Sequence, residues 1–229
     1  MSSARLVERL AVRAVLFDLD GTLADTAGDL AAALNRVRAD RGLPPLPIEA
    51  LRAYASHGAR GMLGAGLGMM REHPEFEVAR DAFLAYYAEA LCEHTRLFAD
   101  AEQVIAEIVR RGLSWGIVTN KAARFTLPLL ERLAFASRPG TIICGDTTPL
   151  AKPHPAPLLA AASQLAVVAA ECVYVGDAER DVLAGQAAGM KTLIAIYGYL
   201  AAEDVPERWA ADGFIASLPA LLEWLPEAA

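Results

Sequence analysis

Three short apolar runs, each leading into a polar residue, limit what this chain can fold into more than any other feature. They are residues 14–17, 114–119 and 172–175. Such short, continuously apolar runs are typical of strands that are buried on both faces of a parallel sheet. Two further runs, 141–144 and 192–196, extend the set, and helical patterns at 125–133 and 157–165 lie between the later strands. This alternation predicts an α/β fold with a parallel, Rossmann-like sheet.

Residues 28–98 interrupt the alternation, because they show helical periodicity and loops but no run that predicts a buried strand. Residues 27–40 and 77–93 predict two helices, with a proline-rich breaker at 42–47 and a glycine-rich stretch at 56–68 between them. We therefore expect an inserted helical lobe. The predicted boundaries are residues 1–24 and 99–229 for the core and residues 25–98 for the lobe.

Composition excludes several classes of protein. With 229 residues, 55% of them hydrophobic, the chain can bury a substantial core, so a disordered or fibrous protein is excluded. Lys and Arg total 21 against 28 Asp and Glu, and the net charge of -7 argues against nucleic acid as a partner. A small anionic substrate must then be held locally, by a metal ion or a helix N-terminus.

The cysteines and the N-terminal residues predict the cellular compartment of the protein. Cys92, Cys144 and Cys172 are an odd number without close pairing, which predicts buried, reduced thiols. Residues 1–12 mix charges with short apolar pieces and lack the continuous apolar stretch of a signal peptide or a membrane anchor. We expect a cytoplasmic protein without a membrane partner, while its oligomeric state is not predicted by the sequence.

The first apolar run leads into two carboxylates, Asp18 and Asp20, followed by Gly21. Residues two apart on an extended segment point the same way, so their charges repel unless a cation or a proton lies between them. Mg²⁺, a hard cation that prefers oxygen ligands, meets that need and also anchors a phosphate. The alternative is an ordinary Asp-Gly turn after a strand.

Two other strand ends carry polar groups of the same kind. Asp177 follows a buried strand, and Asp181 comes four residues later where a helix begins, which could supply further metal ligands or an ordinary helix cap. Thr119, Asn120 and Lys152 could offer a hydroxyl, a backbone amide and an ammonium to phosphoryl oxygens. The alternative for these three is a solvated or capping role.

Four segments in this order resemble the motifs of the haloacid dehalogenase superfamily, over nearly the whole chain. They are DLDGT at 18–22, TNK at 119–121, KP at 152–153 and GDAERD at 176–181. The resemblance implies a Rossmann-like core with a helical cap inserted after the first strand. It also implies a phosphatase, because dehalogenases that resemble the same pattern lack the acid found here at Asp20.

The resemblance implies a role for each motif residue. Asp18 is the expected nucleophile, forming an aspartyl-phosphate, and Asp20 is the expected general acid and base. The cofactor Mg²⁺ is expected on the carboxylates of Asp18 and Asp177 and the backbone carbonyl of Asp20, with Asp181 acting through water or a neighbouring ligand. Thr119, Asn120 and Lys152 are expected to bind the phosphoryl group of a small phosphomonoester.

Several subfamilies stay open at this point. The chain resembles phosphoglycolate phosphatases in Asp25-Thr26 and in its glycine-rich lobe segment, and this is the leading prediction. Residues 56–60, 115–121 and 197–199 also look like those of N-acetylmuramic acid 6-phosphate phosphatases. A mutase of the β-phosphoglucomutase type and a non-catalytic binding protein of the same fold are the remaining alternatives.

The lobe is expected to choose the substrate. His57, Gly58 and Arg60 are expected in a loop that faces the phosphate, where Arg60 could pair with a substrate carboxylate. The alternative is that Arg60 is a surface charge and His57 ends a helix. Hinges are expected near residues 24–28 and 98–100, so that the lobe opens and closes over the site.

Overall fold

A computed structural model describes residues 9–228 and contains a six-stranded parallel sheet in the order β5-β4-β1-β6-β7-β8. Its strands are β1 Ala14–Phe17, β4 Ser114–Val118, β5 Thr141–Ile143, β6 Cys172–Gly176, β7 Lys191–Ala195 and β8 Gly213–Ile215. The five predicted strands are confirmed, with ends shifted by one residue at most. The sequence analysis missed β8, a three-residue edge strand. Residues 1–8 and 229 lie outside the described residues. They belong to the predicted core, and residues 1–8 also belong to the segment 1–12 that was predicted not to be a signal peptide or a membrane anchor.

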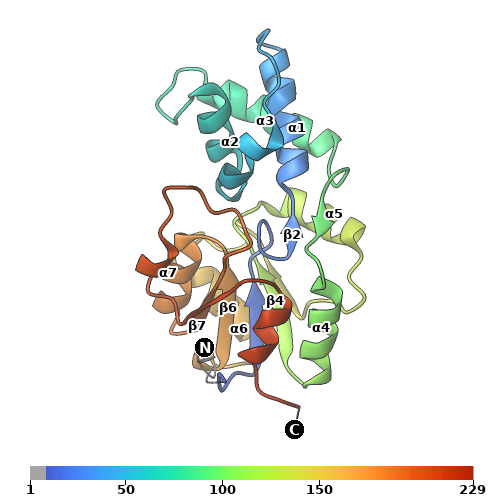
Figure 1. Ribbon diagram of the computed structural model, residues 1–229, viewed down its shortest axis with the longest axis vertical. Helices are drawn as coiled ribbons and strands as arrows, with labels where there is room; N and C mark the ends of the chain where they lie inside the picture. Colours follow the sequence, from blue (N-terminus) through green and yellow to red (C-terminus); the bar gives the residue numbers. More distant parts are fainter. Residues whose placement is uncertain (1–8, 229) are drawn as a thin grey trace, which may run out of the picture.

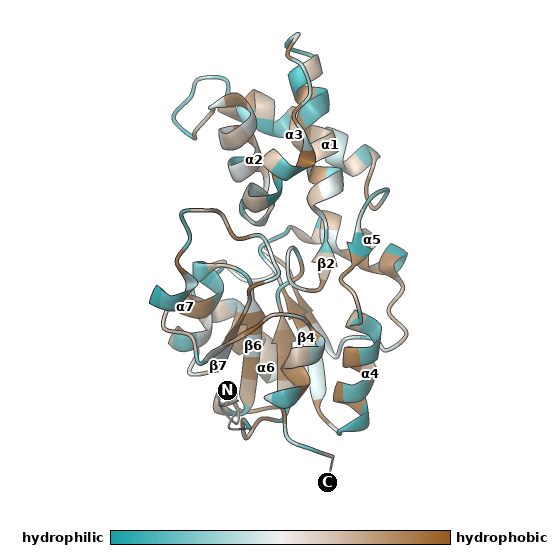
Figure 2. Ribbon diagram, in the orientation of Figure 1, coloured by the Kyte–Doolittle hydropathy of each residue, from teal (hydrophilic) through white to brown (hydrophobic). Residues whose placement is uncertain are grey.

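Helices cover both faces of the sheet, as Figure 1 shows. They are α4 Ala101–Arg110, α5 Ala123–Leu133, α6 Ala156–Gln164 and α7 Glu179–Ala187, with short 3₁₀ turns at Ala169–Glu171, Pro206–Arg208 and Pro219–Glu223. Alternate residues of β1 face opposite layers: Val15 and Phe17 pack in the cluster that includes α4, and Ala14 and Leu16 in the one that includes α6. Both faces are buried, which explains the uninterrupted apolar run. Figure 2 shows the brown strands lying within teal outer helix faces.

The order in which the strands are added to the sheet reverses at β1, which lies between β4 and β6. It runs outward through β4 and β5 on one side, then returns to β6 on the other and continues to β8. Ligands of open parallel sheets bind at such a switch point, beyond the carboxyl ends of the strands. The fold thus places the ends of β1, β4 and β6 side by side.

The helical lobe lies over these strand ends (Figure 1). It contains α1 Ala27–Ala39, the 3₁₀ turns η1 Ile48–Ala50 and η2 Arg52–His57, α2 Gly58–Leu67 and α3 Phe76–Glu89. Leu34, Met62 and Phe83, one from each helix, are fully buried between them. The α/β core with an inserted helical lobe is confirmed, and the second predicted helix ends at residue 89 instead of 93. The domain boundaries at residues 24/25 and 98/99 stay a prediction.

The glycine-rich stretch forms helix α2, so the prediction of a loop around His57, Gly58 and Arg60 is wrong. Glycine is a poor helix former, which hid the helix in the sequence. Two glycines make close packing possible: a Cβ on Gly61 would lie 2.4 Å from the Tyr54 carbonyl oxygen, and one on Gly66 would lie 2.4 Å from Leu34 Cδ2. His57 therefore ends η2, Gly58 begins α2, and Arg60 lies in its first turn.

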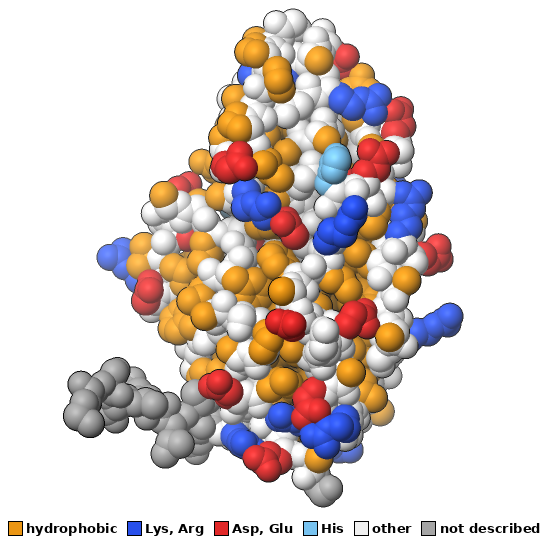
Figure 3. All heavy atoms as spheres, turned by 45° about the vertical axis from the view of Figure 1, so that its right-hand side comes forward, with side chains coloured by type: hydrophobic (Ala, Val, Ile, Leu, Met, Phe, Trp, Pro, Cys, Tyr) orange, Lys and Arg blue, Asp and Glu red, His pale blue; other side chains and the backbone are white. Residues whose placement is uncertain are grey.

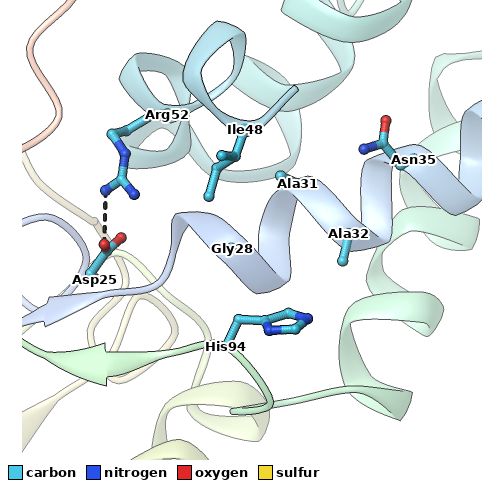
Figure 4. Close-up of a pocket in the computed structure, with 8 residues that line it drawn as sticks. All are labelled: Asp25, Gly28, Ala31, Ala32, Asn35, Ile48, Arg52 and His94. Atoms are coloured by element: carbon cyan, nitrogen blue, oxygen red, sulfur yellow. Dashed lines mark hydrogen bonds and ion pairs between the residues drawn. The ribbon is translucent and has the colours of Figure 1, made fainter. Parts of the chain in front are cut away.

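A two-stranded antiparallel ribbon connects the lobe to the core. It consists of β2 Ala24–Asp25 and β3 Arg96–Leu97. The sequence analysis did not predict β3, which is not a buried strand, because Arg96 is exposed and Leu97 is only partly buried. Strands of two residues are too short to leave a pattern in the sequence. Figure 4 shows Arg52 extending from η2 toward Asp25 beside α1, and the two groups form an ion pair of 2.8 Å. Hinge motion here stays a prediction.

The surface and the thiols complete the description. On the face shown in Figure 3, acidic and basic side chains lie interspersed over both lobe and core. All three cysteines are free; Cys144 and Cys172 are buried as predicted, whereas Cys92 is only partly buried. Within the described residues, no helix has the length and apolar character required to span a membrane.

Candidate active site

Three buried carboxylates meet beyond the ends of β1 and β6. Asp18 follows β1, Asp177 follows β6 and Asp181 lies in the first turn of α7. One carboxylate oxygen from each lies within 4.8 Å of the others, and each residue is at most 2% exposed. The carboxylate of Asp20 is not part of this cluster, and a metal contact through its backbone carbonyl stays a prediction.

The donor set fits a divalent cation. Burial, and after it the carboxylates of Asp18 and Asp181, raise the pKa of Asp177 to about 7, because crowded anions favour protonation or a cation. Gly21 has a φ of +84°, and a Cβ there would lie 2.0 Å from Asp177 Oδ2, so only glycine lets the backbone approach this closely. Oxygen ligands without nitrogen or sulfur are typical of Mg²⁺ sites.

Lys152 sits against the same carboxylates with its side chain fully buried. Its Nζ lies 3.0 Å from Asp18 Oδ1 and 2.8 Å from Asp181 Oδ1. Burial raises the pKa of Asp18 although Lys152 opposes it. For Asp181, burial also acts to raise the pKa, but Lys152, Arg180 and the hydrogen bonds to the carboxylate together keep the pKa below its usual value. A fixed ammonium at this place can offset charge that develops on a transferring phosphoryl group.

Thr119 and Asn120 follow β4 and flank Lys152. The Asn120 amide donates to the Lys152 carbonyl at 2.9 Å, and its Oδ1 accepts from the Lys152 backbone N–H at 3.0 Å. The Asn120 side chain therefore holds the Lys152 loop, and its main chain would have to serve a ligand. Thr119 is 2% exposed, and its hydroxyl oxygen accepts from the Lys121 N–H.

A second cation, Lys121, holds Asp20. Its Nζ lies 2.9 Å from Asp20 Oδ1, and the Thr26 hydroxyl donates to the same oxygen at 2.5 Å. The side chain of Lys121 also lies over the ring of Tyr87 from α3, at 4.7 Å from its centroid. Core and lobe together thus fix the orientation of the Asp20 carboxylate.

A cavity of about 580 Å³ opens between the core and the lobe above these groups. It brings together the predicted site residues of both parts. Its lining includes Asp18, Asp20, Thr119, Asn120 and Lys152 from the core, and His57, Gly58 and Arg60 from the lobe. Asp177 and Asp181 lie next to its floor, within the carboxylate cluster.

The sequence analysis assigned no role to five residues that the structure places around the site. They are Thr26, Ser56, Lys121, Arg180 and Tyr199. Ser56 donates to Asp177 Oδ1 at 2.9 Å, and the Tyr199 N–H donates to Asp177 Oδ2 at 2.8 Å. Each belongs to a segment that carried the family resemblance, and that position within a motif was the available signal.

A parallel sheet with a buried aspartate after its first strand, a buried lysine beside it and an acidic cluster define a hydrolase of the haloacid dehalogenase type. The chain belongs to the haloacid dehalogenase-like hydrolases, whose sequence model matches residues 15–195. The N-acetylmuramic acid 6-phosphate phosphatase of Pseudomonas aeruginosa is 40% identical to it, over 97% of this chain and 98% of that protein. The phosphoglycolate phosphatase of Xanthomonas campestris pv. campestris is 41% identical, over 94% and 96%.

Solved structures agree with the fold. A predicted phosphoglycolate phosphatase from Haemophilus somnus superposes with a TM-score of 0.81 at 24% identity, covering 93% of this chain and 97% of that one. At this identity the similarity shows the fold alone. With the family and the curated relatives, the prediction of a phosphoric monoester hydrolase is confirmed.

Proposed function

We propose that the chain hydrolyses 2-phosphoglycolate to glycolate and phosphate, with Mg²⁺ as cofactor and Asp18 as nucleophile. The observation that carries this proposal is the arrangement of Asp18, which lies 3.0 Å from the Lys152 ammonium and within 4.8 Å of two further carboxylates at the floor of the cavity. A carboxylate can act as a nucleophile on phosphorus when nearby cations reduce the charge repulsion between the two anions.

The reaction has two halves. In the first, an Asp18 oxygen forms a bond to phosphorus, the bond from phosphorus to the alcohol oxygen breaks, and Asp20 gives its proton to that oxygen. In the second, Asp20 takes a proton from water, which attacks the phosphorus and releases Asp18. Mg²⁺, held by Asp18, Asp177 and the Asp20 carbonyl with Asp181 nearby, would supply positive charge at the phosphoryl oxygens.

Unpaired arginines at the cavity support a substrate that carries a second anion. Arg60 and Arg71 line the cavity, and neither makes an ion pair with any residue in the described part of the chain. In a protein of net charge -7, such cations are candidate partners for a ligand carboxylate. The carboxylate of 2-phosphoglycolate fits this requirement.

The second candidate is N-acetylmuramic acid 6-phosphate, which also carries a carboxylate. The cavity volume of about 580 Å³ and its aromatic walls, Phe83, Tyr87 and Phe125, favour a substrate larger than a two-carbon acid. The similarity to the Pseudomonas enzyme over nearly the whole chain supports the same candidate. In both cases we propose residues 25–98 as a cap that moves on hinges near residues 24–28 and 98–100.

The test compares substrates and variants in one assay. Phosphate release is measured with Mg²⁺ from 2-phosphoglycolate, N-acetylmuramic acid 6-phosphate and an aryl phosphate. Of the first two compounds, the one with the higher kcat/KM is identified as the substrate. Asp18→Asn should abolish all three activities. Arg60→Ala should lower kcat/KM for the carboxylate substrates and spare the aryl phosphate, which has no carboxylate.

Three outcomes would overturn the proposal. Undiminished turnover by Asp18→Asn would exclude the nucleophile, and conversion of a hexose 1-phosphate to the 6-phosphate without release of phosphate would indicate a mutase. A wild-type protein that binds phosphate but turns nothing over would indicate a binding protein.

A further inference from the structure

The lobe contacts the core directly at the carboxylate cluster, through Ser56 and His57 at the end of η2. The Ser56 hydroxyl donates to Asp177 Oδ1 at 2.9 Å and accepts a hydrogen bond from Arg180 Nη2 at 3.1 Å. The other arm of the same guanidinium, Nη1, lies 3.1 Å from Nδ1 of His57. One core arginine thus holds two consecutive residues of the lobe.

Arg180 is placed to connect the lobe with the nucleophile. It lies in the first turn of α7, its side chain is 18% exposed, and its Nη2 lies 3.9 Å from Asp18 Oδ2. Burial, followed by the nearby guanidinium, lowers the pKa of His57, so a neutral ring can accept from Arg180 at Nδ1. The guanidinium therefore faces the attacking carboxylate on one side and the lobe on the other.

The lobe and the core also meet at the connection between them, the ribbon of β2 and β3. At the hinge ribbon, Tyr199 donates from its hydroxyl to Asp25 at 2.8 Å and accepts from the backbone N–H groups of Thr26 and Ala27 at the start of α1. Those bonds join residues beside the hinge and need not break when the lobe turns. The bonds of Ser56 and His57 to the core must break when the lobe lifts from the strand ends.

We propose that Ser56, His57 and Arg180 form a latch that holds the lobe closed over the site, and that Arg180 is a positioning residue for the reaction. Two neutral acceptors on a charged donor give hydrogen bonds strong enough to favour closure and weak enough to release the product. Adding a phosphoryl group to Asp18 brings more negative charge near the same guanidinium, which holds Arg180 in the latch position. The expected effect of Arg180 on the reaction rate rests on the proposed phosphatase function.

The first test measures lobe position without turnover. Spin labels are attached through Val78→Cys in α3 and Leu159→Cys in α6, both exposed, with Cys92 replaced by serine. Distances between the labels are measured with Mg²⁺ and beryllium fluoride as the phosphoryl mimic. We expect one narrow distribution in the labelled parent and a broader, longer one after Ser56→Ala or Arg180→Ala. Identical distributions in parent and variants would overturn the latch.

The second test separates a latch from general damage to the fold. Ser56→Ala should lower kcat/KM about tenfold, Arg180→Ala should lower it more, and Arg180→Lys should restore part of the loss. Because Ser56 and Arg180 share one hydrogen bond, the loss in the double variant should be smaller than the product of the two single losses. Arg36→Ala, which removes an exposed ion pair with Glu89 inside the lobe, is the matched control and should behave as the parent.

The outcomes distinguish the two proposals. Losses that multiply in the double variant would show that Ser56 and Arg180 act independently and would overturn the latch. If the substrate proposal fails, every variant is equally inactive on the tested esters, while the label distances still report whether the latch exists.

Discussion

The ammonium group of Lys121 lies 2.9 Å from Oδ1 of Asp20, the carboxylate expected to move the proton. The Thr26 hydroxyl donates to that same oxygen. Oδ2 of Asp20 makes no hydrogen bond to any described residue, so it is the oxygen left to exchange a proton with substrate or water. The two oxygens thus have different tasks: one fixes the side chain and the other reacts.

Replacing Lys121 should therefore damage the proton transfer more than substrate binding. We expect Lys121→Met to lower kcat by about tenfold to a hundredfold, below the full contribution of a general acid, with a smaller change in KM. Thr26→Val should act in the same direction but more weakly, since it removes an uncharged donor. Steady-state kinetics measure the split, and an unchanged kcat in both variants would contradict this reading of Asp20.

Metal binding should stabilise the fold through the carboxylate cluster. We expect Mg²⁺ to raise the melting temperature by about 5–10 °C at a hundredfold excess over its dissociation constant. Without Mg²⁺, Asp177→Asn should have a higher melting temperature than the parent, because it removes one of three crowded carboxylates. When Mg²⁺ is added, the melting temperature of the variant should rise less than that of the parent. Calorimetry measures both, Asp212→Asn serves as the control, and an equal Mg²⁺ shift in all three proteins would argue against the site.

Two glycines of helix α2 should respond in opposite directions to the same change. Gly64→Ala should raise the free energy of unfolding by about 0.5–1 kcal/mol, because alanine is the better helix former and its Cβ would meet only Met70 Sδ, at 3.4 Å. Gly66→Ala should lower it by about 1–3 kcal/mol, because its Cβ would lie 2.4 Å from the buried Leu34 side chain. Urea titrations measure the free energy of unfolding of both variants. Equal changes in the two variants would show that packing does not determine the effect of alanine at these positions.

The stability contributed by Asp212 should depend on pH in a defined direction. Burial alone would raise its pKa, but hydrogen bonds from Lys191 and the Thr192 N–H hold the pKa below the usual value of 3.8. Its stabilisation is then complete above the pKa of the unfolded state and is lost as pH falls through the lower folded value. In urea titrations we expect Asp212→Asn to lose about 1 kcal/mol at pH 7 and to approach the parent only when the pH falls below the folded pKa of Asp212. A difference in the free energy of unfolding between variant and parent that grows as the pH falls would contradict this.

Much of the fold was predictable because buried strands need continuous apolar runs, and those runs are visible in the sequence. β8 and the ribbon of β2 and β3 were missed because two or three residues carry no periodicity. Helix α2 was missed because its glycines serve packing against Tyr54 and Leu34 at the expense of helix propensity. At the site, the motif residues were predictable from type and spacing. The partnership of Ser56 with Arg180 was not, since 124 residues separate them and only the placement of the lobe over the strand ends brings them together.

The ribbon of β2 and β3 has a further consequence for how this chain can change. Because Asp25 pairs directly with Arg96, the chain leaves the core and returns to it at nearly the same point. Everything between these two residues is a cassette whose ends already meet, so it can be exchanged or enlarged without moving β1 or β4, provided that Thr26 and Tyr87, which help to orient Asp20, are kept. Asp18, Lys152 and the acidic cluster would stay in place while the cassette above them is exchanged, so the preference for a particular ester can change while the chemistry of the core is kept.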